Sequence, residues 1–226
     1  MKSIARHPYE DKPALVIYSM VGNDVCNEKD NTLDHMTSTV EFYDNVMETL
    51  TFLEATLPPN SHVVLMGLID GAVLYKAMAQ RYHPLGLLRK DLTYNDVYDW
   101  FSCMEIGPCQ GWMTQNSTLR SLTSAHAEKL SNVLKKIAKN EKKFTKFDIN
   151  FMPNPFQIVI NEWVASGREI WQLIEPVDSL HPTQVTQRMI AKSVWDYLER
   201  NMPHVLGPIN DRNELIEINF TDQGGH

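Results

Sequence analysis

The sequence has no long apolar run. No stretch of its 226 residues is apolar enough to cross a bilayer, which takes about 20 consecutive residues in a helix. The first eight residues, Met1–Pro8, hold no apolar segment of the kind that a signal peptide needs. On their own, these two absences suggest a cytosolic protein.

Positive charge is also scarce. The chain has 21 Lys and Arg residues against 28 Asp and Glu residues, which gives a net charge of −7. Binding to a nucleic-acid backbone needs a basic face, so nucleic acid is excluded as the main partner. One basic cluster, Lys135–Lys146, is typical of the solvent-facing side of a helix. The length allows a single domain with a sizeable core.

Cysteine is rare, and the count of three is odd. Cys103 and Cys109 are close enough in sequence to close a tight loop, which leaves Cys26 over. The alternative is three buried, reduced thiols, as in a cytosolic protein. Two segments, beginning at Asn116 and Asn219, fit the N-glycosylation pattern. Composition therefore leaves the cellular compartment open.

Apolar periodicity predicts strands that alternate with helices. The strands are expected at 14–20, 63–66 and 147–152, and the helices at 36–57, 73–81, 94–101, 119–137 and from 182 through 198, with 157–165 open to either interpretation. This alternation indicates an α/β fold with a mostly parallel sheet covered on both faces. Ligands of such sheets bind beyond the carboxyl ends of the strands. We therefore expect the loops 21–24 and 67–71 to share that edge.

Asp178 and His181 form one candidate catalytic pair. A carboxylate that holds one ring nitrogen of a histidine fixes its tautomer and stabilises the imidazolium that forms during catalysis. A separation of three residues allows this within one tight loop. The alternative is that Asp178 caps the helix that follows and His181 is a surface residue.

Gly22, Asn23 and Asp24 follow the first predicted strand and form the second candidate segment. The amide of Asn23 can donate a hydrogen bond to a developing oxyanion, a contribution of about 3 kcal/mol in known enzymes. Gly22 has no Cβ and lets the loop approach a substrate closely. Asp24 is expected to support the loop. The alternative is an ordinary turn after a strand.

In this order and on this architecture, the two segments resemble the GDSL (SGNH) hydrolase family. In that family a Gly-x-Asn-Asp segment supplies the oxyanion-hole Asn, which matches Gly22, Asn23 and Asp24. An Asp-x-x-His-Pro segment supplies the acid and base of the catalytic triad, which matches Asp178 and His181. The resemblance implies a three-layer, flavodoxin-like α/β sandwich and a carboxylic ester hydrolase.

The family's nucleophilic serine is the part that does not match. It belongs to a Gly-Asp-Ser segment upstream of the glycine–asparagine loop, but Ser3 and Ser19 are the only serines before Gly22, and neither follows Gly-Asp. Ser179 is expected to be a loop residue. We therefore expect residues 1–226 to be a partial hydrolase domain that lacks the nucleophile-bearing block and has negligible activity alone.

The longer segments Tyr18–Cys26 and Glu175–Thr183 are similar to one lipid-acting branch of this family. That similarity implies removal of secondary acyl chains from the lipid A of lipopolysaccharide. It also implies a secreted or lysosomal protein, a saposin-like small subunit as partner, and calcium in the full-length protein. No cofactor is expected in this chain.

The same similarity makes a Cys103–Cys109 disulfide plausible, with Cys26 bridging to a segment outside this chain, and it makes glycosylation at Asn116 and Asn219 credible. Candidates for an acyl-binding groove are Trp112, Met113 and the stretch Leu85–Leu88, although core packing is the more common reason for such residues.

Two other interpretations remain. The chain can be a non-catalytic isoform that binds lipid or a partner or that misfolds, or it can be an unrelated α/β protein with chance motifs. Chance motifs would have no reason to place Asn23 and His181 at the same edge of the sheet.

Overall fold

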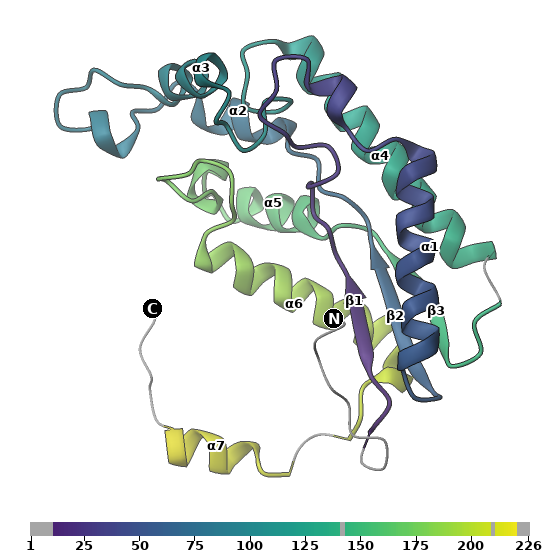
Figure 1. Cartoon of the computed structure of the whole chain (residues 1–226). Coiled ribbons are helices and arrows are strands. Elements are labelled where there is room, and N and C mark those ends of the chain that lie inside the picture. Colours follow the sequence, from purple (N-terminus) through teal and green to yellow (C-terminus); the bar gives the residue numbers. More distant parts are fainter. Residues whose placement is uncertain (1–10, 141–142, 209–210, 221–226) are drawn as a thin grey trace.

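The computed structural model describes residues 11–140, 143–208 and 211–220, in which strands and helices alternate along most of the chain (Figure 1). The elements are β1 (Leu15–Tyr18), η1 (Thr32–His35), α1 (Thr39–Thr56), β2 (Ser61–Met66), α2 (Ala72–Met78), η2 (Pro84–Gly86), α3 (Tyr94–Met104), α4 (Ser117–Asn140), β3 (Phe147–Met152), α5 (Phe156–Ala165), η3 (Ile170–Leu173), α6 (Gln184–Asn201), η4 (Pro203–Val205) and α7 (Asn213–Phe220), where η denotes a 3-10 helix.

The described strands form one parallel sheet, as the sequence predicts, and their order is β1-β2-β3. Ile17 pairs with Val64, and Val64 pairs in turn with Asn150. Parallel strands need crossover connections, which α1 provides between β1 and β2, and α2, α3 and α4 provide between β2 and β3.

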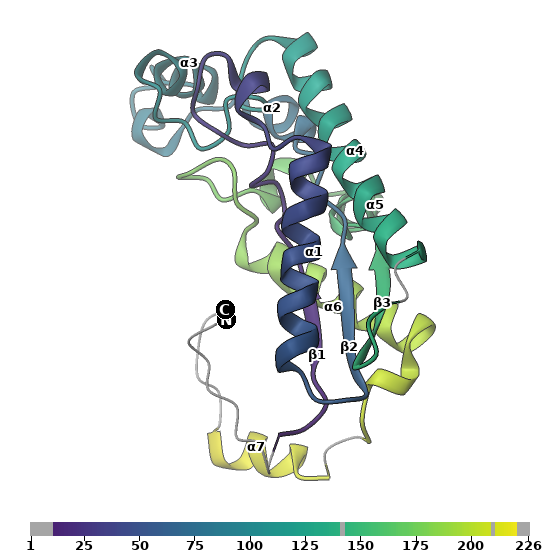
Figure 2. The same ribbon diagram turned by 45° about the vertical axis from the view of Figure 1, so that its right-hand side comes forward.

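The central strand β2 carries apolar residues on both faces because helices cover the sheet from both sides. Val63 and Leu65 belong to the core formed with α1 and α4, whereas Val64 and Met66 pack with residues of α6 and the turn after it. Figures 1 and 2 show α1 and α4 on one side of the sheet and α5 and α6 on the other. The predicted three-layer α/β sandwich is confirmed.

Helix ends follow local capping. The Ser38 side chain accepts a hydrogen bond from the backbone N–H of Glu41 and begins α1. Thr183 caps α6 in the same way, so this helix begins at Gln184, and the expectation that Pro182 lies in its first turn is wrong. The ambiguous segment near 157–165 is the helix α5, which buries Val159 and Ile160 against Leu173.

The predicted cysteine pairing is wrong. The disulfide joins Cys26 to Cys109, and Cys103 is an exposed free cysteine. Cys103 lies near the end of α3 and faces solvent, whereas Cys109 is fully buried against the loop that follows β1. The short sequence separation of Cys103 and Cys109 was therefore misleading, and the leftover cysteine is Cys103 rather than Cys26.

The predicted glycosylation sites lie on the surface. Asn116 is exposed at the start of α4, where its side-chain oxygen accepts a hydrogen bond from the backbone N–H of Leu119. Asn219 is exposed on α7, and Thr221 of its glycosylation segment lies outside the described residues. Among the described helices, none combines the length and the apolar character that crossing a membrane requires.

Candidate active site

A cavity of about 450 Å³ lies at the carboxyl ends of the strands, the position that the alternating pattern predicts. It is lined by the loops that follow all three strands and by the connection between α5 and α6. Gly22 and Asn23 enter it from the first of these loops, and His181 enters it from the last. Its volume is within the range of small-molecule sites, and its walls are mainly apolar.

Asp178 and His181 are paired as expected. Oδ2 of Asp178 lies 2.7 Å from Nδ1 of His181, and Oδ1 accepts hydrogen bonds from the backbone N–H groups of Leu180 and His181. With Nδ1 engaged, Nε2 is the nitrogen left to accept a proton from a nucleophile. The His181 side chain is 69% exposed, so this nitrogen is open to a ligand.

Two opposing effects act on Asp178. Partial burial works to raise its pKa, but the hydrogen bonds from Leu180 N–H, from the His181 ring and from His181 N–H outweigh it and hold the pKa below the usual value. Asp178 is therefore ionised at neutral pH, the state that can orient His181 and stabilise its protonated form.

The loop that carries this pair is held by α3 and by its own backbone. Tyr94 donates its hydroxyl hydrogen to the carbonyl of Pro176, and Tyr98 donates to the carbonyl of Ser179. Burial raises the pKa of Tyr98 far above its ordinary value, so its phenol stays protonated and able to donate. Ser179 has φ +56°, in the left-handed region. The sequence analysis did not identify this support from α3.

Asn23 is exposed at the cavity. Its backbone N–H donates a hydrogen bond to the carbonyl of Met20, whereas its side-chain amide has no hydrogen bond among the described residues. The preceding Val21 has φ +57°, which is unusual for a β-branched residue. Such strain persists only where the surroundings impose it, and it is concentrated at functional sites. The sequence pattern gave no signal for this strain.

Gly22 also leaves space for a neighbouring side chain, while its expected role at the oxyanion hole stays a prediction. A Cβ at this position would lie 3.0 Å from the Trp112 ring, and a Cβ at Gly71 would lie 2.2 Å from it. The two glycines thus make room for Trp112, which is 1% exposed and donates from Nε1 to Ser124. Trp112 lines the cavity and also belongs to the core, while Met113 is buried in the core.

Asp24 lies beside this site but outside the cavity wall. Its backbone carbonyl accepts a hydrogen bond from Thr37 N–H, which ties the loop to the segment before α1. Burial of the Tyr18 side chain raises the pKa of its phenol, and the negative charge of the Asp24 carboxylate raises it further. Both contacts are consistent with support of the loop, which stays a prediction.

Ser179 and Ser19 direct their hydroxyl groups to partners other than His181. Ser179 is completely buried, and its hydroxyl donates to the carbonyl of Asp178, which confirms it as a loop residue. Ser19 lines the cavity just after β1, but its hydroxyl donates to the sulfur of Met66. Among the described residues, no hydroxyl is hydrogen-bonded to the His181 ring.

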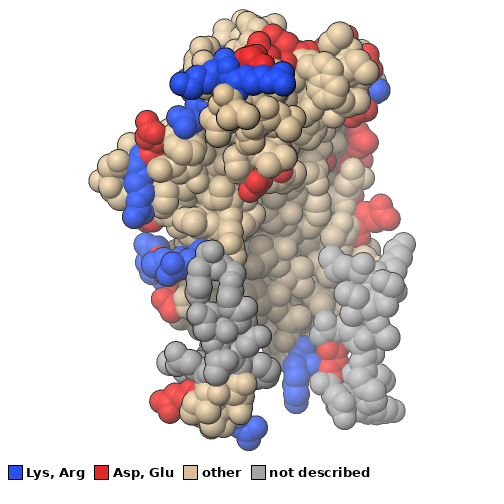
Figure 3. Space-filling model, turned by 90° about the vertical axis from the view of Figure 1, so that its left-hand side faces the viewer, with Lys and Arg blue, Asp and Glu red and all other residues tan. Residues whose placement is uncertain are grey.

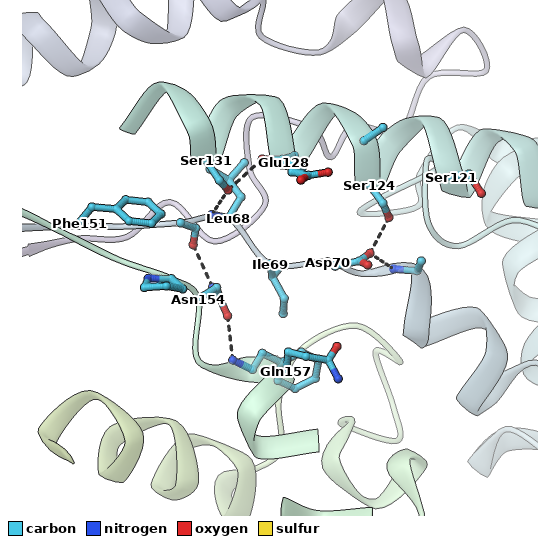
Figure 4. Close-up of a pocket in the computed structure, with 16 residues that line it drawn as sticks. Leu68, Ile69, Asp70, Ser121, Ser124, Glu128, Ser131, Phe151, Asn154 and Gln157 are labelled. Carbon is cyan, nitrogen blue, oxygen red and sulfur yellow. Dashed lines mark hydrogen bonds between the residues drawn. The ribbon is translucent and has the colours of Figure 1, made fainter. Parts of the chain in front are cut away.

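A second cavity of about 640 Å³ lies beside the first, and the two share Ile69, Asn154 and Phe156. Figure 4 shows Ser124 and Ser131 of α4 facing the loop that follows β2. Ser124 donates to Asp70, and Ser131 accepts from the backbone N–H of Leu68. None of the predicted site residues lines this cavity.

Within the described part of the chain, one group of three metal-binding side chains is found: His62, Asp148 and His204. It lies at the amino ends of β2 and β3, away from the candidate active site. Calcium prefers oxygen ligands, so two imidazoles do not suit it. These residues do not fit the calcium that the resemblance implies.

The family model described as GDSL-like Lipase/Acylhydrolase matches residues 2–194. The chain therefore belongs to the GDSL lipase/acylhydrolase family, whose members are hydrolases. Among individual proteins, it is 48% identical over 226 residues to an acyloxyacyl hydrolase from Mus musculus and 47% identical over 226 residues to one from Homo sapiens. A third acyloxyacyl hydrolase, from Oryctolagus cuniculus, is 45% identical over 227 residues.

Each of these three similarities covers 100% of this chain and 39% of the relative. The chain thus spans well under half the length of the proteins it matches. The family match excludes the interpretation of chance motifs. The structure agrees, because Asn23 and His181 line one cavity at the same edge of the sheet.

Proposed function

We propose that this chain supplies the general acid–base pair and part of the oxyanion hole of a serine-dependent carboxylic ester hydrolase. The observation that supports it best is the shared cavity of Asn23 and His181, with Asp178 hydrogen-bonded to Nδ1 of His181. Within the described residues, a ring nitrogen of His181 and the side-chain amide of Asn23 have no hydrogen-bond partner, and such groups at one apolar cavity suit acyl transfer from an ester.

In the proposed mechanism, Nε2 of His181 takes the proton from the attacking serine hydroxyl. The serine oxygen then bonds to the ester carbon, and the negative charge on the former carbonyl oxygen is stabilised by the Asn23 amide. His181 returns the proton to the leaving alkoxide, which departs as the alcohol. Ionised Asp178 holds the imidazolium in place throughout. Water then attacks the ester carbon of the acyl-enzyme, with His181 again taking the proton and returning it to the serine oxygen, and the fatty acid is released.

We propose a lipid ester as substrate, specifically a secondary acyl chain on the lipid A of lipopolysaccharide. An acyloxyacyl ester joins a fatty acid to the hydroxyl of another acyl chain, so both sides of the scissile bond are apolar. The cavity walls include Ile69, Leu74 and Ile190, which suit such chains. The name of the three relatives supports the same bond type.

We further propose that the nucleophilic serine lies outside these 226 residues and that the isolated chain has negligible esterase activity. The test uses the purified chain and a longer protein, in which the portion of the Mus musculus relative that precedes the matched region is joined to this chain. We expect the longer protein to release fatty acid from lipopolysaccharide and the chain alone to release almost none. Robust hydrolysis by the chain alone contradicts the proposal, and Ser19→Ala then tests whether Ser19 is the nucleophile.

The second candidate function is a non-catalytic form that binds lipid or a protein partner. The apolar cavity is equally suited to holding an acyl chain without cleaving it. Binding of a fatty acid or lipid A by the chain, with no turnover even in the longer protein, favours this function. Turnover by the longer protein excludes it as the function of the complete protein.

The location and partners are proposals as well. The Cys26–Cys109 disulfide supports a secreted or lysosomal location, because disulfides persist in oxidising compartments. A saposin-like small subunit is proposed as the partner of the full-length protein. Calcium is proposed to bind it at residues other than the group of His62, Asp148 and His204.

A further inference from the structure

The turn between α2 and α3 exposes three leucines. Leu85 is 83% exposed, Leu87 is 61% exposed and Leu88 is 96% exposed. These values contradict core packing as the reason for the apolar stretch 85–88. Figure 1 shows this turn projecting from the body of the molecule beyond the carboxyl ends of the strands. Exposed apolar residues that occur together mark an interaction surface more often than apolar residues that are scattered singly over a surface.

Fixed contacts hold the turn in this conformation. The His83 side chain is buried, and its Nδ1 accepts a hydrogen bond from Leu85 N–H, which sets the start of η2. Gly86 is buried so closely against Leu92 that an added Cβ would lie 2.4 Å from the Leu92 Cβ. Lys90 N–H closes the turn onto the Gly86 carbonyl at 2.7 Å. The leucines are therefore presented to solvent by a defined backbone.

Positive charge follows the leucines directly. Arg89 and Lys90 are both exposed, although the chain as a whole has a net charge of −7. Figure 3 views the molecule from the side toward which the turn projects, and it shows basic side chains at the upper end of this face, with acidic side chains beside them, above a largely uncharged, hollowed centre. An apolar tip with cations beside it matches a lipid layer with anionic headgroups, since both the acyl region and the headgroups find partners.

We propose that residues 84–90 dock this protein on an anionic lipid surface, with the three leucines entering the apolar layer and Arg89 and Lys90 contacting the headgroups. A projecting tip suits insertion into a lipid layer. A stable protein–protein interface needs about 800 Å² on each partner, far more than three leucines at a tip provide.

The docking turn is linked to the candidate active site. Nε2 of His83 donates to the carbonyl of Val177 at 3.0 Å, one residue before Asp178. Arg81, just before the turn, lies over the Trp171 ring at 3.7 Å. Docking would therefore hold the loop of His181 next to the lipid layer. This consequence rests on the proposed function, whereas the binding itself does not.

The test is co-sedimentation of the full 226-residue chain with vesicles of phosphatidylcholine alone or mixed with phosphatidylglycerol. We expect the chain to bind the anionic vesicles more tightly than the neutral ones. Replacing Leu85, Leu87 and Leu88 together by Ser should weaken binding by roughly tenfold or more, because these side chains lose their burial in lipid. Replacing Arg89 and Lys90 by Ser should remove the preference for anionic vesicles and the sensitivity of binding to salt.

The matched control replaces three exposed apolar residues on other elements by Ser, namely Val40, Leu122 and Val185. We expect this control variant to bind vesicles as the unaltered chain does. We also expect every variant to have the same unfolding temperature as the unaltered chain. Equal binding by the leucine variant and the control, or no binding by the unaltered chain, overturns the proposal. A dimer in solution that the leucine variant abolishes assigns the surface to a second copy instead. Hydrolysis is not measured, so failure of the proposed function and failure of docking are separate outcomes.

Discussion

Asp178 and His181 show how much of a site three residues of separation can specify. The loop returns on itself, so that Oδ1 of Asp178 binds two backbone N–H groups and Oδ2 binds the His181 ring. This pairing could be predicted because all its atoms come from one short segment. The support from Tyr94 and Tyr98 could not, because it comes from a helix about 80 residues earlier.

The lowered pKa of Asp178 predicts a pH dependence of stability. A carboxyl group whose pKa is depressed in the folded state stabilises the fold fully above its unfolded pKa, about 3.9, and loses this contribution as the pH falls through the folded pKa. Asp178→Asn should therefore lower the unfolding temperature at about pH 6 and have less effect at about pH 2. Thermal unfolding over this range checks it, with Asp44→Asn on the exposed side of α1 as control. An equal effect of Asp178→Asn at both pH values contradicts the account.

At the scale of elements, Trp112 is the packing centre between the loops that follow β1 and β2. It lies against Gly22 and Gly71 and is hydrogen-bonded to Ser124 of α4. The sequence analysis offered an acyl groove or core packing for Trp112. It could not identify the two glycines as its neighbours, because neither local pattern shows that a distant ring fills the space beside the glycine.

Gly71→Ala should destabilise the protein, since its Cβ would lie 2.2 Å from Cε3 of Trp112 and the ring would have to shift. We expect a loss of about 1–3 kcal/mol in the free energy of unfolding, as for other overpacked cores. Denaturant unfolding measures this loss. Gly207→Ala is the control, because a Cβ there meets nothing within 4 Å. Equal stability of the two variants would show that the loops do not pack as described.

The Cys26–Cys109 disulfide joins the loop after β1 to the loop between α3 and α4, with a sequence separation of 83 residues. Replacing both cysteines by Ser should lower the free energy of unfolding by about 2–4 kcal/mol, because the unfolded chain regains the freedom that the link removes. Cys103→Ser should leave stability nearly unchanged, since this thiol is free and exposed. A large loss of stability in Cys103→Ser would contradict this account, because Cys103 would then have to be the partner of Cys109, as the sequence suggested.

At the scale of the whole molecule, the order of apolar segments predicted most of the architecture. The continuous run Val63–Met66 indicated a strand buried on both faces, and it is the central strand of the sheet. The topology of a parallel sheet then placed the loops that follow the strands at one edge. Helix ends and the disulfide were less predictable, because they depend on single side-chain contacts across the fold.

The candidate catalytic residues also lie together at this edge of the sheet. Asn23 and His181, 158 positions apart in the sequence, line one cavity because both loops open at the carboxyl ends of the strands. The proposed docking turn lies beside this edge through the contact of His83 with Val177. Catalytic groups and lipid contact would thus be on the same end of the molecule.

The most direct test of the central claim is the turnover number for fatty-acid release from lipopolysaccharide by the longer protein, with His181→Ala compared with His35→Ala. His35 is an exposed histidine on η1 and is not in the cavity wall. The account predicts that His181→Ala lowers the turnover number by roughly a thousandfold or more and that His35→Ala leaves it unchanged. Equal turnover by the two variants would contradict the assignment of His181 as the general base.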